Sequence, residues 1–172
     1  MNSKKVCKTD NEMELYFDAI SVNESLARVA VAAFVTEKNP TLEELSDIKT
    51  AVSEAVTNAI IHGYGNDGRK KKADESSVYI EDETEEKVRL RCRFIDKLLM
   101  IEVEDKGIGI EDVAQAMEPL FTTKPDQERS GMGFSFMEAF MDELEVESAP
   151  GVGTLVKMQK EIGYHPWICE EE

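Results

Sequence analysis

The sequence predicts a two-layer α/β sandwich of the α+β class, in which a mixed sheet is covered on one face by helices. Two long segments carry apolar residues at the three- and four-residue spacing of amphipathic helices. Two others alternate apolar and charged residues with the period of two that a half-buried strand requires. Strands and helices are mixed along the chain without regular alternation, which is typical of one sheet with its helices on one side.

The first strand and the first helix are expected before Pro40. Residues 13–20 have extended character, with alternate apolar side chains on one face: Leu15, Phe17 and Ala19. A helix is expected from Asn23, its N-cap, to Glu37. The apolar spacing assigns it a buried stripe made of Leu26, Val29, Ala30, Ala33 and Phe34. Asn39-Pro40 ends the helix, because proline restricts the residue before it to extended backbone.

A second helix is expected to begin at Thr41-x-x-Glu44, since this spacing is typical of a capping box. Gly63, followed by Gly65, ends it. The side that packs on the sheet is expected to comprise Leu42, Leu45, Ile48, Val52, Ala55, Val56, Ala59 and Ile60.

A hairpin is expected in residues 88–94 and 98–104, with Asp96-Lys97 as its two-residue turn. In this register apolar residues face each other and arginines face glutamates: Cys92 with Ile101, Leu90 with Val103, Arg91 with Glu102 and Arg89 with Glu104. Such cross-strand pairs stabilise a sheet, so the register is consistent with itself. A shorter strand is expected at residues 78–80.

Beyond the hairpin the sequence predicts a loop-rich segment, one helix and a last strand. A short helix fits residues 111–117. A longer one follows from Phe134, with inward side chains at Met137, Phe140, Met141 and Leu144. Ala149-Pro150-Gly151 then turns the chain into a strand at residues 154–160.

The composition argues against several classes of protein. The 172 residues contain no apolar run of the ~18 residues that a membrane span needs, and the first residues lack a signal peptide's apolar core, so a cytoplasmic protein is expected. A formal net charge of -16 repels nucleic-acid phosphates. It favours a basic protein partner or simply solubility, and charge alone does not decide between them. Three cysteines without a CxxC pair indicate neither a zinc site nor a disulfide framework.

Glu54 and Asn58 lie one turn apart on the side of the second helix that faces away from its apolar stripe. A solvated helix face shows the same pattern. A carboxamide oxygen is, however, a good ligand for Mg²⁺, which takes its other ligands from water and phosphate. A carboxylate beside it is able to accept the proton of an attacking hydroxyl group. The pair is therefore a candidate metal and general-base site.

Asp105 closes an apolar run and precedes two glycines, Gly107 and Gly109, that let backbone approach a ligand closely. A half-buried carboxylate needs a hydrogen-bond donor, and an adenine amine or an ordinary turn amide would supply one. Further along, Gly131 and Gly133 lead into a helix, whose free N–H groups form an anion cradle.

The segment between these motifs is expected to form a lid from Glu111 to Ser130. Its polar groups, and those that lead into the following helix, are candidate nucleotide contacts: Thr122, Thr123, Lys124, Arg129, Ser130 and Met132. Arg129 is suited to grip a terminal phosphate, because guanidinium groups bind phosphate through paired hydrogen bonds.

The motifs occur in the order of the nucleotide site of the GHKL (Bergerat) ATP-binding family, which includes gyrase and histidine kinases, and they resemble it. Its fold is also an α/β sandwich. SEAVTNAIIHGY, PLFTTKP and ERSGMGF are further similar to the small serine kinases that act as anti-sigma factors in spore-forming bacteria. The similarity extends over residues 12 to 162, so we expect one domain, residues 1–172, with an extra N-terminal segment 1–12 and a tail 163–172. The region 65–87 is longer and more charged than in that family.

The resemblance implies ATP and Mg²⁺ as cofactors. It also implies a sigma factor that is held inactive, an anti-anti-sigma protein phosphorylated on serine, and a homodimer built through the first helix and first strand. It assigns the general base to Glu54, the Mg²⁺ ligand to Asn58 and adenine recognition to Asp105. Further implied contacts are Gly107, Gly109, Gly131, Gly133 and Thr154, with Arg129 at the phosphate and at a protein partner. Arg28, off the apolar stripe of the first helix, is expected to face a partner.

Three alternatives stay open. Sequestering a sigma factor needs no turnover, so the chain would then be an ATP-gated binding protein. A general-stress type of kinase would act on a different sigma factor. A plain ATPase domain of the gyrase kind is disfavoured, because no transducer domain is attached. Autophosphorylation on His62 or His165 is also disfavoured, since no helical hairpin with an acceptor histidine precedes the domain.

Overall fold

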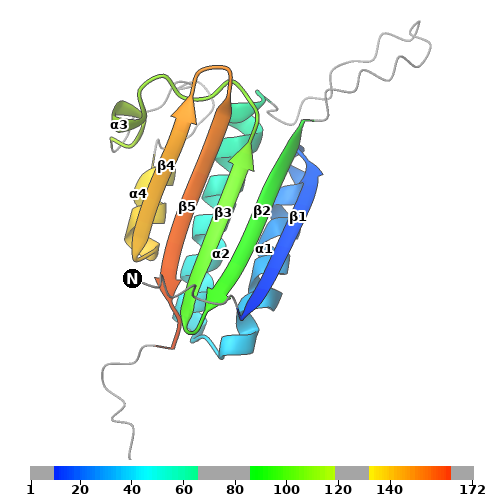
Figure 1. Cartoon of the computed structure of the whole chain (residues 1–172), viewed down its shortest axis with the longest axis vertical. Coiled ribbons are helices and arrows are strands. Elements are labelled where there is room, and N and C mark those ends of the chain that lie inside the picture. The colour runs from blue at the N-terminus through cyan, green and yellow to red at the C-terminus, as the bar shows by residue number, and fades with distance from the viewer. Residues whose placement is uncertain (1–9, 66–85, 119–131, 164–172) are drawn as a thin grey trace, which may run out of the picture.

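The computed structural model describes residues 10–65, 86–118 and 132–163. Within them, five strands form one sheet in the order β1-β2-β3-β5-β4, and α1, α2 and α4 lie on one of its faces (Figure 1). The elements are β1 (Asn11–Asp18), α1 (Val22–Val35), η1 (Thr36–Lys38), α2 (Leu42–Asn58), η2 (Ala59–Gly63), β2 (Lys87–Ile95), β3 (Leu98–Asp105), α3 (Val113–Ala116), α4 (Gly133–Phe140), β4 (Glu143–Ala149) and β5 (Gly153–Glu161).

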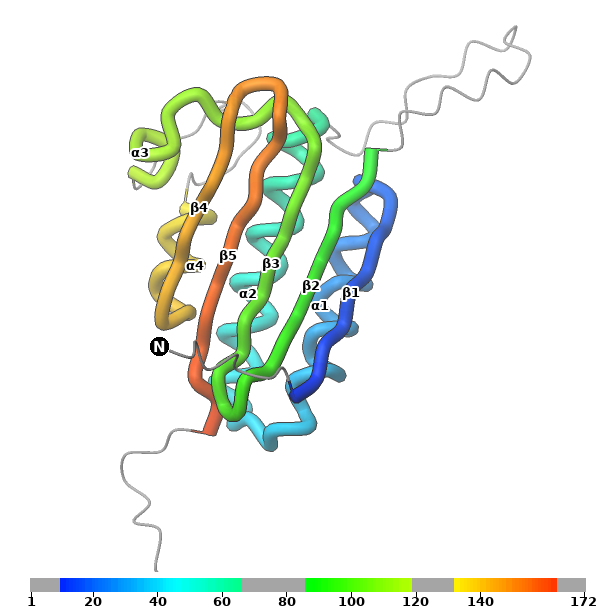
Figure 2. Tube along the Cα trace, in the orientation of Figure 1, coloured from blue at the N-terminus to red at the C-terminus, as the bar shows by residue number. Residues whose placement is uncertain are grey.

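The predicted two-layer α+β architecture is confirmed. All four pairings among the described strands are antiparallel, so the parallel pair that a mixed sheet requires is absent from this part of the chain. β3 lies beside β5 rather than β4, and Figure 2 shows how the chain passes from β3 to the far edge before β5 returns between them. The expected strand at residues 78–80 lies outside the described residues.

The predicted hairpin is confirmed in every pair. Cys92 faces Ile101, Leu90 faces Val103, Arg91 faces Glu102 and Arg89 faces Glu104. The alternation is reflected in burial, because Val88, Leu90, Cys92 and Phe94 are all buried and the arginines between them are not.

The predicted capping box of α2 is also confirmed. The Thr41 hydroxyl accepts from the Glu44 amide at 3.1 Å, and the Glu44 carboxylate accepts from the Thr41 amide at 2.6 Å. Such a cap stabilises a helix by about 1 kcal/mol. The buried side of α2 contains Ile48, Ala51, Val52, Ala55 and Val56. Leu42, the first residue of the helix, was expected there but is 87% exposed.

The buried stripe predicted for α1 is wrong for most of its residues, although Phe34 packs against the core and stacks on Phe94 with ring centroids 5.3 Å apart. Its buried residues are Ala27, Val31 and Val35, whereas Leu26 is 50% and Val29 is 67% exposed. The helix is apolar on most of its circumference, so periodicity alone does not determine which side meets the sheet. The predicted N-cap is also wrong, because Ser21 precedes the helix and the Asn23 side chain donates instead to the Asp18 carbonyl.

β4 was not anticipated from the sequence. α4 ends at Phe140, earlier than expected, and ELEVESA then alternates exposed glutamates with half-buried Leu144, Val146 and Ser148. Met137 and Met141 are buried as predicted, and Leu144 reaches the core from a strand rather than from the helix.

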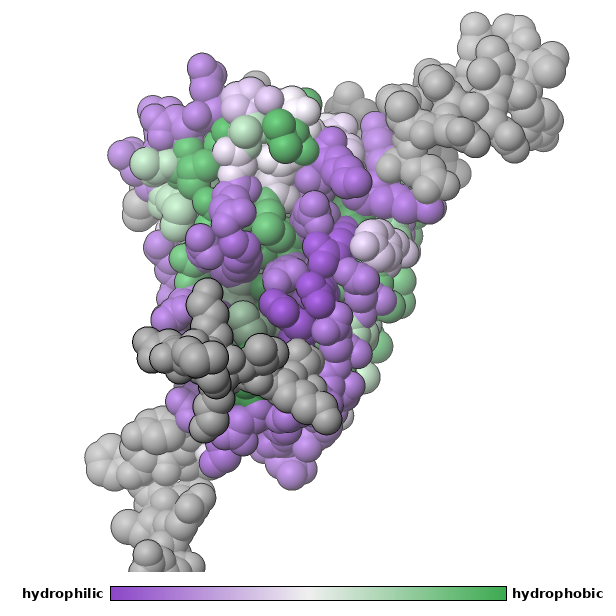
Figure 3. Space-filling view, viewed as in Figure 1, coloured by the Kyte–Doolittle hydropathy of each residue, from purple (hydrophilic) through white to green (hydrophobic). Residues whose placement is uncertain are grey.

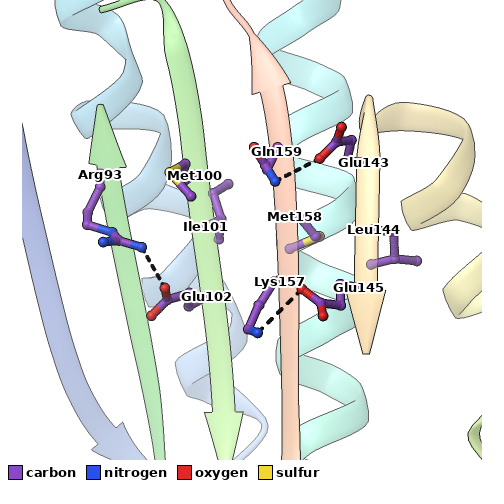
Figure 4. Close-up of a pocket in the computed structure, with 10 residues that line it drawn as sticks. All are labelled: Arg93, Met100, Ile101, Glu102, Glu143, Leu144, Glu145, Lys157, Met158 and Gln159. Carbon is purple, nitrogen blue, oxygen red and sulfur yellow. Dashed lines mark hydrogen bonds and ion pairs between the residues drawn. The ribbon is translucent and has the colours of Figure 1, made fainter. Parts of the chain in front are cut away.

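The outer face of the sheet, which the described helices leave uncovered, is a ladder of charged side chains. Arg89 bridges Glu14 and Glu104, and Arg93 pairs with Glu102 at 2.8 Å. Figure 3 shows hydrophilic residues gathered over β2 and β3. Figure 4 shows a hollow on this face where Arg93 points to Glu102 and Lys157 points to Glu145. These charged side chains pair with one another across the strands.

None of the helices in the described ranges combines the length and the apolar character that crossing a bilayer requires.

Candidate functional site

Glu54 and Asn58 lie side by side against the start of α4. Both are half-buried on the side of α2 that α4 approaches. A β-carbon on Gly133 would stand 3.1 Å from Glu54 Oε2 and 3.2 Å from Asn58 Nδ2. A carboxylate, a carboxamide and the first residue of a helix therefore meet at one place, and Gly133 leaves them room.

The start of α4 has no side-chain cap in the described residues. Met132 occupies the N-cap position, and its carbonyl accepts from the Phe136 amide. The first N–H groups of a helix lack partners within it, and the helix dipole adds partial positive charge there. This end of α4 is therefore suited to an anion, and it lies against Glu54 and Asn58.

Asp105 is the last residue of β3 and is only 5% exposed. Its carboxylate accepts from the Gly107 amide at 2.9 Å, and the Thr154 amide also stabilises it. Burial outweighs these bonds and raises the pKa of Asp105 to about 6. Gly63, at the end of η2, borders the carboxylate so closely that a β-carbon there would be 2.7 Å from Oδ1.

The turn after Asp105 is held between the end of η2 and the β4–β5 hairpin. A β-carbon on Gly107 would come within 2.1 Å of the Gly63 carbonyl oxygen, which itself accepts from the Ile108 amide. Gly109 has φ +72°, and a β-carbon there would be 2.0 Å from the Ala149 carbonyl oxygen. Both positions thus exclude larger residues.

The two clusters lie along one helix. Asn58 ends α2 and Gly63 ends η2, a separation on the order of 7 Å along the axis. In Figure 1 this is the upper end of the sheet, where β3 ends and the β4–β5 turn lies. The structure therefore brings Glu54, Asn58, Asp105 and Gly133 to one end of the molecule.

Two hydroxyl groups that sequence reasoning missed support this end of the sheet. The Tyr64 hydroxyl donates to the Lys87 carbonyl at 2.7 Å and accepts from the Lys106 amide at 2.8 Å. Ser148 contacts both Ile110 and Thr154. Sequence reasoning gave neither residue a role, although Tyr64 ends the stretch SEAVTNAIIHGY and Ser148 has an inward position in an alternating segment.

Arg28 lies on α1, and its side chain is 43% exposed. It pairs with Glu24 at 3.5 Å, and Glu24 accepts from the Ser53 hydroxyl on α2. The arginine is thus joined through Glu24 to the residue before Glu54. Other predicted contacts lie outside the described residues: Thr122, Thr123, Lys124, Arg129, Ser130 and Gly131.

Comparison with known proteins shows close relatives. Residues 18–160 match the family described as the histidine kinase-like ATPase domain. The chain is 53% identical over 152 residues to the anti-sigma F factor of Clostridium novyi (strain NT), an alignment that covers 88% of this chain and 95% of that protein. It is 45% identical over 159 residues to the anti-sigma F factor of Bacillus subtilis (strain 168), with coverage of 92% and 98%.

A solved structure with the same fold contains the RsbU and RsbW domains of a Mycobacterium tuberculosis protein. The TM-score is 0.56 at 17% identity, over 88% of this chain. The chain spans 32% of that structure's length, and the likeness is one of fold alone. The fold, the order of the motifs and the curated relatives lead to one conclusion: the chain belongs to the anti-sigma F factor family, within the wider family of histidine kinase-like ATPase domains.

Proposed function

We propose that this chain is an anti-sigma factor that binds a sporulation sigma factor and uses Mg-ATP to phosphorylate a serine of an anti-anti-sigma protein. The observation that carries the proposal is the meeting of Glu54, Asn58 and the uncapped start of α4. Family membership identifies an ATPase-type domain, so ATP is the nucleotide that this site would take. A sigma factor is met in the cytoplasm, where we expect the protein to act.

The base of the nucleotide would lie at Asp105. A carboxylate that is ionised above pH 6 accepts hydrogen bonds, and the exocyclic amine of adenine donates them. Thr154 lies directly opposite Asp105 in the ladder, with its side chain on the same face. Gly107 and Gly109 would bring turn backbone close to the ring.

The phosphates would lie between the start of α4 and the Glu54–Asn58 pair. The donor set fits Mg²⁺, because Asn58 presents a carboxamide oxygen beside a carboxylate in a half-buried site, and Mg²⁺ binds through few protein ligands plus phosphate oxygens. Asn58 would hold the ion, which neutralises phosphate charge when bound. Gly131 and Arg129, implied by the family resemblance, would complete the phosphate contacts.

The chain's own residues would then carry the transfer. Glu54 orients the serine hydroxyl of the partner and accepts its proton as the serine oxygen bonds to the terminal phosphorus and the bond to ADP breaks. The N–H groups at the start of α4 stabilise the charge that develops on the phosphoryl oxygens. Positioning and electrostatics account for most of such catalysis.

The exposed side of α1 is the proposed dimer surface. Val22, Leu26 and Val29 are 70%, 50% and 67% exposed, and their spacing places them on one side of the helix. A contiguous apolar surface of this kind marks an interaction site. We propose that β1 and α1 form a homodimer contact and that Arg28, which is half-exposed on α1, contacts a partner.

The test is incubation with Mg-ATP and a candidate anti-anti-sigma protein, followed by mass spectrometry of both proteins. We expect phosphate on a partner serine with the wild type and at least a ~100-fold slower transfer with Glu54→Gln. The variant is expected to keep ATP and sigma binding. If a folded Glu54→Gln protein lost sigma binding as well, the separation of the two roles would be wrong.

ATP-gated sequestration without transfer is the second candidate, supported by the curated name that the relatives share. ATP and sigma binding without phosphate on any candidate partner would favour it. A general-stress type of kinase would instead bind a different sigma factor in the same assay.

A further inference from the structure

Ser148, at the inner face of β4, has a hydroxyl group with three partners. It accepts from the Ile110 amide at 2.8 Å and donates to the Gly153 carbonyl at 2.8 Å. Its third contact is the Thr154 hydroxyl at 3.0 Å. The first two directions are fixed by chemistry, because an amide N–H only donates and a carbonyl only accepts.

The third direction follows from the proton count. A serine hydroxyl has one proton, and that of Ser148 is engaged by the Gly153 carbonyl. In the contact between the two hydroxyls Thr154 must therefore be the donor. The proton of the Thr154 hydroxyl is then used in the bond to Ser148, while its oxygen still has a lone pair. Toward a ligand this hydroxyl is therefore an acceptor.

Two acceptors are thereby placed together at the end of β3 and the start of β5. Thr154 is the cross-strand partner of Asp105, and its amide also bonds the Asp105 carboxylate. Among purines, a 6-amino group donates hydrogen bonds and a 6-oxo group accepts them. A site whose acceptors face the 6-position therefore binds a 6-amino group and repels a 6-oxo group.

We propose that Ser148 is a positioning residue for purine selectivity: by holding the Thr154 proton, it makes the site favour 6-amino over 6-oxo purine nucleotides. The inference rests on the proposed nucleotide site at Asp105. Ser148 acts by orienting the Thr154 hydroxyl, so it does not have to contact the base itself.

The experiment compares three nucleotides that differ at the 6-position: ATP, inosine triphosphate and purine riboside triphosphate. The last has only hydrogen there, so it lacks the donor without adding an acceptor. Dissociation constants are measured by calorimetry at about pH 8, well above the pKa of Asp105. For the wild type we expect inosine triphosphate to bind about 10- to 100-fold more weakly than ATP, the range of one mismatched buried hydrogen bond.

In Ser148→Ala the Thr154 hydroxyl is released and is able to donate to a 6-oxo group. We expect the ratio of inosine triphosphate to ATP dissociation constants to fall about fivefold or more. The ratio for purine riboside triphosphate should stay unchanged, because that base has no acceptor to gain from. Ser148→Thr keeps the hydroxyl and should retain the wild-type ratios, and Ser46→Ala, on the exposed side of α2, is the matched control.

If Ser148→Ala lowered the affinity for all three nucleotides by the same factor, Ser148 would only support the structure of the site, and the inference would be overturned. Equal wild-type affinities for ATP and inosine triphosphate would overturn it too. Should Ser148→Ala not fold, Thr154→Val removes the same acceptor and must lower the ratio of inosine triphosphate to ATP dissociation constants, while Asp105 keeps part of the preference. Failure of the wild type to bind any of the nucleotides would instead refute the proposed function.

Discussion

Asp105 is a carboxyl group held where water hardly reaches, and this couples its ionisation to folding. Its pKa is raised from 3.8 to about 6, mainly by burial. Between these values the unfolded chain has released the proton while the folded chain keeps it. Stability contributed by this group is therefore full below pH 3.8 and falls as pH rises toward 6, by about 3 kcal/mol.

Asp105→Asn removes this dependence, since an amide does not titrate. We expect the variant to gain stability relative to the wild type between pH 4 and pH 7, because only the wild type loses the contribution. Urea unfolding of both proteins at pH 4 and pH 7 measures this difference in stability. The contributions of the other carboxylates cancel, because both proteins contain them. If the free energy of unfolding had the same pH dependence in both proteins, the expected ionisation of Asp105 would be contradicted.

Gly107 offers a second residue-scale prediction. Its α-carbon packs on the Gly63 backbone, and an added methyl group would meet the carbonyl oxygen at 2.1 Å. Gly107→Ala should cost about 1–3 kcal/mol and weaken ATP binding, because the turn must move away from Asp105. Gly65→Ala is the control: its φ is +73° but no atom lies within 4 Å, so ATP affinity should be kept.

At the scale of the element, α1 has two apolar sides of different use. Ala27, Val31 and Val35 are buried, and Leu26 and Val29 face outward. This outward apolar side is the one that the proposed dimer contact would cover.

Val29→Asp should therefore convert the proposed dimer to a monomer while leaving the fold intact, because Val29 is 67% exposed and its charge would be solvated in the monomer. Sedimentation velocity measures the change, and circular dichroism checks the fold. Lys49→Asp, on the exposed side of α2, is a control that should sediment like the wild type. A monomeric wild type at high concentration would remove the basis of the proposed contact.

At the scale of the whole molecule, the net charge of -16 acts on encounter rather than on the fold. Association with a basic sigma factor should slow by tenfold or more between low and high salt, on the order seen for steered association, with a smaller change in dissociation. Stopped-flow mixing measures both rates. Salt-independent association would indicate that this charge serves solubility alone.

The sequence predicts this structure best where a local pattern is compatible with a single backbone arrangement. The hairpin register follows from alternating arginines and glutamates, and the start of α2 follows from Thr41 and Glu44. The placement of Glu54 beside Asn58 needs only the helical period.

The errors occur where long-range packing decides. Either side of α1 is apolar enough to face a sheet, so sequence cannot choose between Val29 and Val31. β4 was missed because its leucine and glutamates also suit a helix. Ser148 and Tyr64 act through partners up to 42 residues away, which no local pattern contains. The roles expected for Glu54, Asn58 and Asp105 came from the family resemblance, because helical period and strand alternation place a side chain without naming its ligand.

Because the start of α4 lacks a side-chain cap within the part of the chain that the structure describes, the proposed nucleotide would complete the hydrogen bonding of this helix. Its first N–H groups have no side-chain acceptor in the described residues, so a bound phosphate would be the missing N-cap. Nucleotide occupancy and order at the start of α4 are then one equilibrium: exchange of its first amides with solvent slows as ATP binds and quickens as the terminal phosphate leaves. The helix that helps to position the reaction would thus also register which stage the reaction has reached.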